Sequence, residues 1–291
     1  MNMDKEKIIE HFGAEFYNKV LNDLEKYSNL WSLSEFEHID YYSVNCNFKC
    51  VSAKYGLCVL KIGKPSNVTQ TEYQILQEYK GGGKFCEVYE ADIANGVLLI
   101  ERITPGIQLR DELNFDKRLD VFCDLFHGLH IEPVNKTIYP TYMEWVSKIT
   151  EYMKNCGKHE ELCEKMIRAE QICRSLFEKY RGEMLLHGDL HHENILLGED
   201  NRYRIIDPKG VIGDSVFDIP RFILNEFEYD TYVKVTKTLS EKLNISEYDI
   251  RRLVYMELCM AFCWCVEGGD EPSVEEIDMI LFVEKLMEEM E

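Results

Sequence analysis

Two polar segments of the chain carry the residue types that phosphoryl transfer requires. The segment LLHGDLHHENIL (185–196) places Asn194 five positions after Asp189, and RIIDPKG (204–210) supplies Asp207. Apolar residues flank both segments, so we expect the polar groups to be held at the ends of strands. A carboxylate can orient an attacking hydroxyl and accept its proton, while an amide oxygen and a second carboxylate hold magnesium against phosphates. These residue types, in this order, favour phosphoryl transfer from ATP.

The same residues have simpler interpretations. A single Asp or Asn in a loop is usually a turn or cap residue, and His191 and His192 are possible zinc ligands. Adjacent histidines do not match the usual zinc spacings, and no cysteine stands near them. His187 is expected to brace the loop by hydrogen bonding rather than to act as a base. Three polar groups in this order, within two apolar frames, are hard to explain as capping.

Lys61 ends the apolar strand CVLK at 58–61. A kinase needs a lysine at such a place to neutralise the α- and β-phosphates, fixed by a helix carboxylate. Glu72, on the helix predicted over 68–79, is the natural partner, and Glu78 on the same helix is its rival. Taken alone, Lys61 would more often be a solvated strand end, but the downstream loops favour the ATP-binding interpretation.

The elements predicted around these residues are of two kinds, mainly strands in the N-terminal part of the chain and helices in the rest. The first 30 residues have helical periodicity, and short strands are expected at 40–43, 48–53, 57–62, 85–89 and 97–102. Asn95-Gly96 indicates a hairpin turn. Helical patterns follow near 116–130, 141–156 and 160–181, and again from about 217 with breaks near Asn225, Asn244 and Gly268-Gly269. We therefore expect a small N-terminal nucleotide-binding lobe with a sheet at 1–104 and a larger helical, catalytic and substrate-binding lobe at 105–291.

The composition narrows the class of partner. The formal net charge of -20 over 291 residues disfavours nucleic acid, which needs a basic patch. It would attract a cationic substrate, although solubility explains it equally well. No stretch is long and apolar enough for a membrane helix, and the charged start MNMDKEKIIEHFG is no secretory signal, so we expect a cytoplasmic location. The 11 cysteines are expected to be reduced, with Cys259, Cys263 and Cys265 acting as small buried hydrophobes rather than metal ligands.

A family resemblance supports the chemistry. HGDLHHENIL followed by IIDPKG resembles the catalytic and metal loops of the aminoglycoside phosphotransferase superfamily. The longer string IDPKGVIGDSVFDIPRF resembles its streptomycin 6-phosphotransferase and hydroxyurea phosphotransferase branch. GVLLIERITPG (96–106) and CWCVEGGDEP (263–272) resemble that branch's hinge strand and its C-terminal helix and turn. The resemblance covers most of the chain after about residue 40. It implies an α+β, bilobal protein-kinase-like fold, with ATP as co-substrate and Mg²⁺ as metal.

The resemblance also implies a role for each matched residue. Asp189 would be the catalytic base, and Asn194 and Asp207 would bind magnesium. Asp218 would buttress the catalytic loop, and the alternative of an ordinary helix N-cap is nearly as good.

The nucleotide-binding side is less clearly marked. By analogy with the family, backbone groups of Glu101 and Ile103 would meet the adenine, and a plain strand end is the alternative. The nucleotide loop should fall at 43–49, which contains no glycine, so a close backbone cradle for phosphate is less obvious. Asn45, Asn47 and Lys49 are its candidate contributors, while Lys209 and Arg102 are left unassigned.

Three functions are compatible with these features. The first is an ATP-dependent O-phosphotransferase acting on a small polar molecule, such as the aminocyclitol antibiotic streptomycin. The second is a metabolic kinase for a sugar or amino alcohol, and the third is a nucleotide-binding protein without turnover. Acidic residues on the C-terminal helices are candidates to receive a cationic substrate, although a solvated acidic face is expected for most of them: Glu226, Glu228, Glu257, Glu267 and Asp270. The sequence does not indicate an oligomeric state.

Overall fold

The computed structural model describes residues 3, 5–39 and 45–290. The chain forms two compact units, one made of 1–107 with 196–207 and the other of 108–195 with 208–291. The segment 196–207 therefore carries Asp207 into the same unit as Lys61. The residues on both sides of this segment, 108–195 and 208–291, belong to the second unit.

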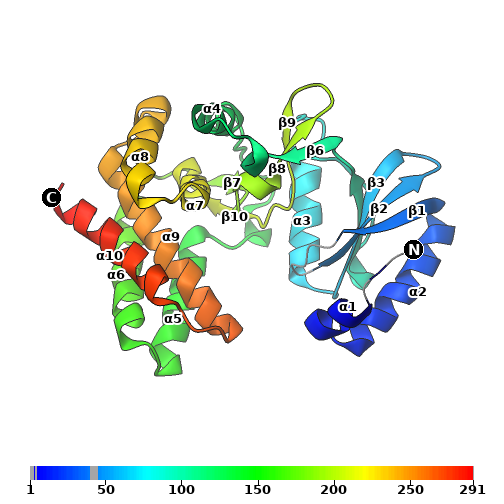
Figure 1. The fold of residues 1–291 in the computed structure, drawn as a ribbon, viewed down its shortest axis with the longest axis horizontal. Helices are drawn as coiled ribbons and strands as arrows, with labels where there is room; N and C mark the ends of the chain where they lie inside the picture. Colours follow the sequence, from blue (N-terminus) through cyan, green and yellow to red (C-terminus); the bar gives the residue numbers. More distant parts are fainter. Residues whose placement is uncertain (1–2, 4, 40–44, 291) are drawn as a thin grey trace. The chain divides into compact units, whose positions relative to one another are not determined.

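The first unit is built on an antiparallel sheet (Figure 1). Its strands pair in the order β1-β2-β3-β5-β4. They are β1 (Leu33–Ile39), β2 (Asn45–Ser52), β3 (Gly56–Gly63), β4 (Val88–Asp92) and β5 (Val97–Glu101). An antiparallel sheet near the N-terminus, as the sequence predicted, is confirmed.

The two faces of the sheet receive different helices. Because successive strand residues point to opposite faces, Leu60 and Ile62 share one face of β3, where they join the hydrophobic core formed with α1 (Lys5–Phe12) and α2 (Ala14–Leu30). Lys61 points to the other face, where it contacts Glu72 of α3 (Asn67–Glu78). The pleat of β3 thus separates the apolar core from the charged side chain.

Some sequence expectations changed in this unit. The strand β1 was not predicted, and the strand expected at 40–43 lies outside the described residues. Asn95-Gly96 does lie in the turn of a hairpin, since β4 and β5 pair antiparallel up to Asp92 and Val97, and this turn contains a short 3₁₀ helix (Ile93–Asn95) that Asp92 caps through the Asn95 N–H. Of the expected nucleotide loop, 43–44 lie outside the described residues and 45–49 belong to β2, where Lys49 pairs with Glu37 at 2.7 Å.

Short strands frame the two chemical segments. The loop after β7 (Met184–Leu186) holds His187 and Asp189, and β8 (Ile195–Gly198) starts directly after Asn194. β9 (Tyr203–Ile205) ends two residues before Asp207. β7 pairs antiparallel with β10 (Val211–Gly213), and β8 lies between β9 and β6 (Pro105–Gln108). The polar residues thus follow or precede strands, as the apolar flanks predicted.

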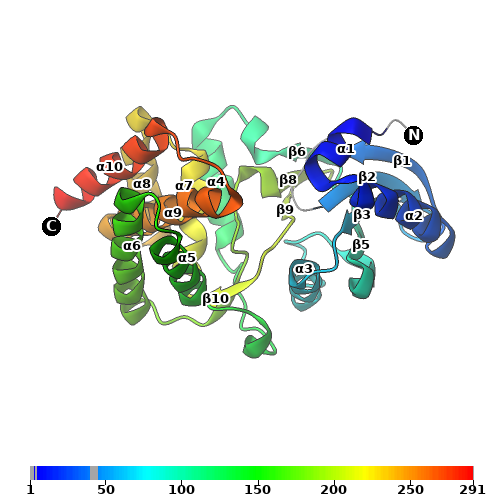
Figure 2. The same ribbon diagram turned by 90° about the horizontal axis from the view of Figure 1, so that it is seen from below.

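The second unit is mainly helical, which confirms the predicted architecture. Its helices are α4 (Phe115–Phe126), α5 (Tyr142–Cys156), α6 (Glu160–Lys179), α7 (Ile219–Asn225), α8 (Tyr229–Leu243), α9 (Glu247–Gly268) and α10 (Val274–Glu288). α9 packs against α5, α6, α7, α8 and α10 (Figure 2). Most of its side chains are buried, as expected of a helix surrounded by others. Among the described residues, no helix has the length and apolar character needed to cross a membrane.

Candidate active site

The loop that carries Asp189 is braced by His187. The His187 side chain is fully buried, and its Nδ1 accepts a hydrogen bond from the Asp189 N–H at 3.0 Å. Its carbonyl oxygen accepts from the N–H groups of Lys209 and Gly210, at 2.8 and 3.1 Å. His187 thus makes hydrogen bonds to both ends of this region, to Asp189 through its side chain and to Lys209 and Gly210 through its carbonyl oxygen.

Asp218 holds the same loop from the other side. Its carboxylate is 1% exposed and accepts hydrogen bonds from the N–H groups of His187 and Gly188, both at 2.8 Å. His130 Nε2 lies 2.9 Å from the same carboxylate. Burial alone would raise the pKa of Asp218, but His130 and these N–H groups lower it below its ordinary value. In the described chain its side chain does not cap α7, so the geometry is that of a buttress.

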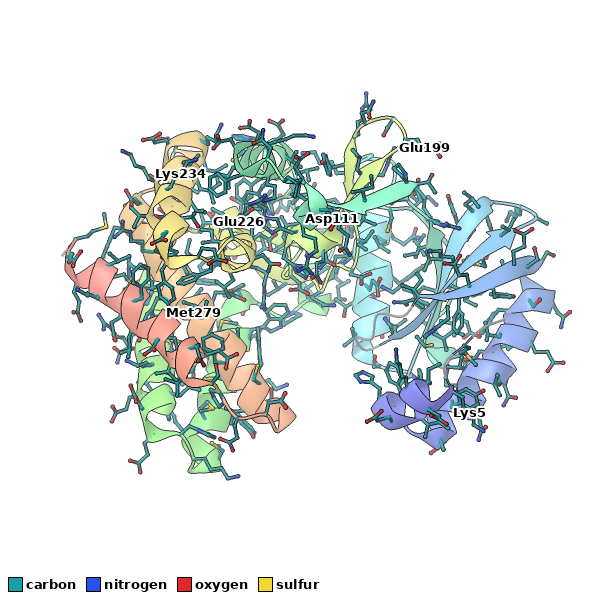
Figure 3. All side chains as sticks on the ribbon, viewed as in Figure 1. Lys5, Asp111, Glu199, Glu226, Lys234 and Met279 are labelled. Atoms are coloured by element: carbon teal, nitrogen blue, oxygen red, sulfur yellow. The ribbon has the colours of Figure 1, made fainter. Side chains whose placement is uncertain are left out.

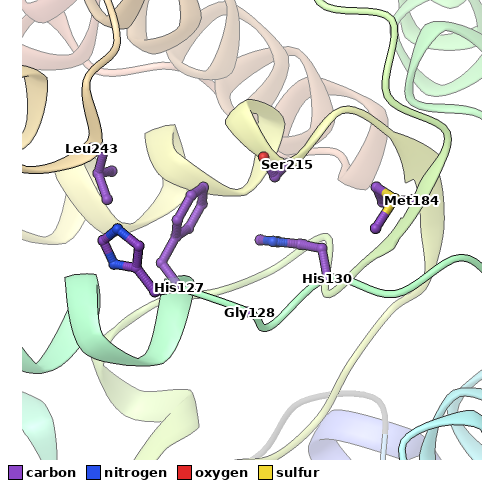
Figure 4. A pocket seen from close by; sticks show the side chains of 7 residues that line it. His127, Gly128, His130, Met184, Ser215 and Leu243 are labelled. Atoms are coloured by element: carbon purple, nitrogen blue, oxygen red, sulfur yellow. The ribbon is translucent and has the colours of Figure 1, made fainter.

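A shallow pocket lies beside this brace (Figure 4). It has a volume of about 290 Å³ and is lined by His130 together with His127, Met184 and Ser215. The importance of His130 was not visible in the sequence, where it follows an unremarkable helix.

Basic groups surround the Asp189 carboxylate. Arg221 Nε lies 3.3 Å from Oδ1, and Lys209 Nζ lies 3.9 Å from Oδ2. His191 Nε2 lies 3.8 Å from Oδ1, and burial lowers the pKa of this histidine to about 4, so it is neutral at pH 7. Asp189 remains 23% exposed, which leaves a carboxylate oriented by its neighbours yet open to a substrate.

Asn194 is fixed beside Asp189 by its own amide group. Its Nδ2 donates to the Asp189 carbonyl at 2.9 Å and lies 3.1 Å from His191 Nε2. Because the nitrogen is engaged, Oδ1 is the atom that suits a metal. Amide and carboxylate oxygens are the donors that Mg²⁺ prefers, so Asn194 in the second unit and Asp207 in the first each offer an oxygen of the right kind.

The first unit contains a second, separate cluster of charges. Lys61 is 4% exposed, and its Nζ lies 2.5 Å from both Glu72 Oε1 and Asp207 Oδ1. Burial alone would lower the pKa of Lys61, but the two carboxylates raise it above its ordinary value, so the lysine stays charged. Glu72, rather than its rival Glu78, is the helix carboxylate that meets Lys61.

Asp207 also has an unusual backbone. Its φ of 59° lies in the left-handed region, which residues other than glycine seldom occupy and which often marks functional sites. The described residues contain no group of three or more His, Cys, Asp or Glu side chains that could hold a metal. All 11 cysteines are free thiols, and Cys259 and Cys263 are buried.

The strand end expected to meet adenine is tied to the segment before β4. The Glu101 N–H donates to the Glu87 carbonyl at 2.7 Å, and the Glu101 carboxylate accepts from the Glu87 N–H at 3.1 Å. Ile103 follows β5 and is 7% exposed. These contacts fix the strand end, and its contact with adenine stays a prediction.

Two of the acidic residues considered as contacts for a cationic substrate have buried side chains. Glu226, at the end of α7 (Figure 3), is 7% exposed and pairs with Arg118 and with His192, whose Nε2 lies 2.7 Å away. Glu257 is 3% exposed and accepts from the Tyr142 hydroxyl at 2.6 Å. These two residues are the exceptions to the solvated acidic face that was expected for most of the five candidates.

The other three acidic candidates behave as expected. Glu228, Glu267 and Asp270 are exposed to solvent. An isolated surface carboxylate attracts a cation only weakly in water.

Known proteins place this combination of fold and loops in one family. A family model described as "Aminoglycoside/hydroxyurea antibiotic resistance kinase" matches residues 47–268. The chain belongs to this aminoglycoside/hydroxyurea antibiotic resistance kinase family, which confirms the resemblance seen in the catalytic loops.

Curated relatives agree at a distance. Streptomycin 3''-kinase of Klebsiella pneumoniae is 28% identical over 158 residues, which cover 53% of this chain and 55% of that protein. Streptomycin 6-kinase of Streptomyces griseus is 24% identical over 163 residues, covering 55% and 52%. Hydroxyurea phosphotransferase of Kitasatospora aureofaciens is 23% identical over 223 residues, covering 74% and 64%. The chain thus spans between about half and two thirds of the length of these relatives.

Solved structures establish the fold. Choline kinase LicA from Streptococcus pneumoniae superposes with a TM-score of 0.70 at 18% identity, covering 94% of this chain and 99% of that one. A thermostable mutant of aminoglycoside phosphotransferase APH(4)-Ia, solved with ADP and hygromycin B, gives 0.65 at 11% identity, covering 91% and 96%. The chain therefore has the protein-kinase-like fold shared by choline kinases and aminoglycoside phosphotransferases, as the motifs implied.

Proposed function

We propose that the chain is an ATP-dependent O-phosphotransferase acting on a small polar molecule. The observation that carries this proposal is the burial of Lys61 between the carboxylates of Glu72 and Asp207. Such a cluster is a poor source of stability, because taking charges out of water is unfavourable. A lysine fixed by a helix carboxylate beside a metal-binding aspartate is, however, what the phosphates of ATP require.

Each residue then has a role toward the nucleotide. Lys61 would contact the α- and β-phosphates, with Glu72 keeping its ammonium group in place, and the backbone of Glu101 and Ile103 would meet the adenine. Asn194 and Asp207 would hold Mg²⁺, which supplies positive charge against the phosphate oxygens when it is bound.

Asp189 would act on the acceptor. Its carboxylate orients the acceptor hydroxyl and takes its proton as the hydroxyl oxygen forms a bond to the γ-phosphorus. The bond between the γ-phosphorus and the β–γ bridging oxygen breaks in the same transfer, so ADP leaves and the acceptor becomes a phosphate ester. His187 and Asp218 would keep the loop in the geometry that this transfer needs.

The acceptor is proposed to belong to the aminoglycoside or aminocyclitol class, with streptomycin the first compound to test. The family and the two relatives named as streptomycin kinases support this choice. The net charge of -20 would attract a cationic acceptor at low salt.

A second candidate acceptor is a small neutral compound such as hydroxyurea. It is favoured by the burial of Glu226 and Glu257, since these carboxylates already pair with Arg118 and Arg221 respectively and neither is available to a polyamine. One relative is named as a hydroxyurea phosphotransferase.

Mass spectrometry of the acceptor tests the proposal. The enzyme is incubated with ATP and Mg²⁺, and with either streptomycin or hydroxyurea. A mass gain of one phosphoryl group is expected for one of them, and Asp189→Asn should reduce the rate by on the order of 10² to 10⁴-fold. Asp200→Asn, which alters an aspartate paired with Arg204 in the turn between β8 and β9, is the matched control and should leave the rate unchanged.

Other outcomes point to the other functions. Phosphorylation of a sugar or an amino alcohol alone, found by screening acceptors for ADP release, would establish the metabolic kinase. ATP binding without ADP release for any acceptor would favour a nucleotide-binding protein without turnover.

A further inference from the structure

Arg221 stands between two carboxylates in the second unit. It lies on α7 one helical turn after Asp218, and its Nε is 3.3 Å from Asp189 Oδ1. Its Nη2 is 2.9 Å from Glu257 Oε1. The guanidinium group therefore joins the candidate catalytic carboxylate to a buried carboxylate on α9.

The guanidinium group is itself held in place. Glu257 is 3% exposed and is fixed by the Tyr142 hydroxyl at 2.6 Å, so it is a rigid anchor for Arg221. The Arg221 Cζ also lies 5.8 Å from the centroid of the Trp264 ring, within reach of a cation–π interaction. An arginine bound on two sides in this way presents its Nε in a defined direction.

That direction is toward Asp189. The Arg221 Nε is buried and, among the described residues, has no hydrogen-bond partner of ordinary geometry, so its contact with Asp189 is one of charge alone. A small rotation of the Asp189 carboxylate would turn this contact into a hydrogen bond. The arrangement thus supplies a donor whose natural acceptor is the candidate catalytic group.

Charge balance makes the arginine necessary. Burial alone would lower the pKa of Arg221, but Glu257 and Asp189 raise it above its ordinary value, so the side chain is charged. Without it, Glu257 would lose its cation, and Asp189 would keep only the more distant Lys209, whose Nζ lies 3.9 Å away. Repulsion and solvation would then turn Asp189 toward solvent.

We propose, on the basis of the proposed function, that Arg221 is a positioning residue that fixes the carboxylate of Asp189 for proton acceptance. Asp218 holds the backbone of the loop through the N–H groups of His187 and Gly188, and Arg221 holds the side chain that the loop presents. The short segment 218–221 thereby fixes both the backbone of the loop and the side chain of Asp189. Lysine is a poor substitute at this position, because one ammonium nitrogen cannot take the places of both Nε, which faces Asp189, and Nη2, which faces Glu257.

Steady-state kinetics of Arg221→Gln test this role. ADP release is measured with MgATP and streptomycin, and again with water as the only acceptor, so that the result does not depend on the identity of the acceptor. We expect kcat to fall about 10²-fold, the scale reported for a displacement of about 1 Å at a reacting group. KM for ATP should stay within about twofold, because the Lys61 cluster is untouched, whereas a general loss of structure would change both constants.

Three further variants separate positioning from folding. Arg168→Gln is the matched control, since Arg168 also bridges to a partly buried glutamate, Glu284, away from the site. Arg221→Lys should recover only part of kcat. Glu257→Gln removes the anchor but keeps the arginine charge, and it should lower kcat as Arg221→Gln does. In the double mutant of Arg221→Gln and Glu257→Gln, the change in activation free energy should be less than the sum of the two single changes.

The possible failures are distinguishable. Absence of ADP release by the wild type with every acceptor would overturn the proposed function, and full turnover in Asp189→Asn would overturn the role of Asp189 and with it that of Arg221. Loss of turnover in Asp189→Asn together with normal kcat in folded Arg221→Gln would overturn only the role of Arg221. If Arg221→Gln does not fold, folded Glu257→Gln decides the question, since an unchanged kcat there contradicts the proposal and a lower kcat at constant KM for ATP supports it.

Discussion

The ammonium group of Lys61 lies 2.5 Å from the carboxylate of Asp207, across 146 positions of sequence and within one compact unit. Glu72 is equally close on its other side. Because Lys61 and Glu72 are each 4% exposed, the cation and at least one anion are removed from water together. Under the proposed function, these three groups bind the nucleotide, and removing only one of them would leave a buried charge without its partner.

Replacing Lys61 should separate these two properties. Lys61→Met leaves Glu72 buried without its cation and should lower the free energy of unfolding by about 3 kcal/mol, the order found when a buried pair is broken. Lys61→Met with Glu72→Gln should restore most of that loss, because no buried charge remains, yet should still fail to use ATP. Denaturant unfolding and ADP release measure the two properties, and normal ATP use by the double mutant would contradict the assigned role.

Asp207→Asn should weaken binding of ATP in the presence of magnesium. Asparagine tolerates the left-handed φ of 59°, so the substitution removes charge without adding backbone strain. We expect affinity for MgATP to fall by at least about tenfold, and affinity for ATP without metal to change much less. Calorimetry with and without Mg²⁺ tests this, with Asp200→Asn as control. An unchanged dependence on magnesium would point to other ligands.

Gly188 should not tolerate a side chain. Its φ is 79°, and a Cβ there would lie 2.8 Å from Trp145 Cη2. Gly157, with φ of 65° and open space around it, is the matched control for backbone strain alone. Gly188→Ala should lose more stability and turnover than Gly157→Ala, and Trp145→Leu should recover part of the difference. Equal effects of the two alanines on thermal unfolding and kcat would refute the steric argument.

Glu226 should make stability depend on pH in the acidic range. Burial alone would raise its pKa, but Arg118 and His192 lower it from 4.5 to about 2. A depressed pKa in the folded state means that the stabilising contribution is complete above about 4.5 and is lost as the pH falls toward 2. Glu226→Gln should therefore be less stable than the wild type at pH 7, with a gap that narrows progressively below pH 4.5.

Chemical unfolding at several pH values between 7 and 3 measures that gap. The exposed neighbour Glu228 supplies the control, because Glu228→Gln should follow the wild-type curve throughout. A gap of constant size at every pH would show that the Glu226 charge is not what stabilises the pair.

The local sequence pattern was sufficient to predict most helices and strands. Apolar periodicity located the helices, and glycine or asparagine marked their ends, as at Asn244 and Gly269, both of which have positive φ. β1 was missed because only Leu33 of its seven residues is buried, so its strand shows no apolar alternation. Pairing with β2, rather than its own sequence, makes that segment a strand.

The sequence by itself determined the two chemical loops, the carboxylate and amide types within them, and the family. These depend on spacings of a few residues, which the chain encodes directly. Only the tertiary structure decided that Arg221 meets Asp189, that His130 meets Asp218, and that Arg118 and His192 contact Glu226. Partners such as Arg118 and Glu226 are 108 positions apart. No local pattern can predict such pairs, because burial and the packing of α4 and α7 select which charges meet.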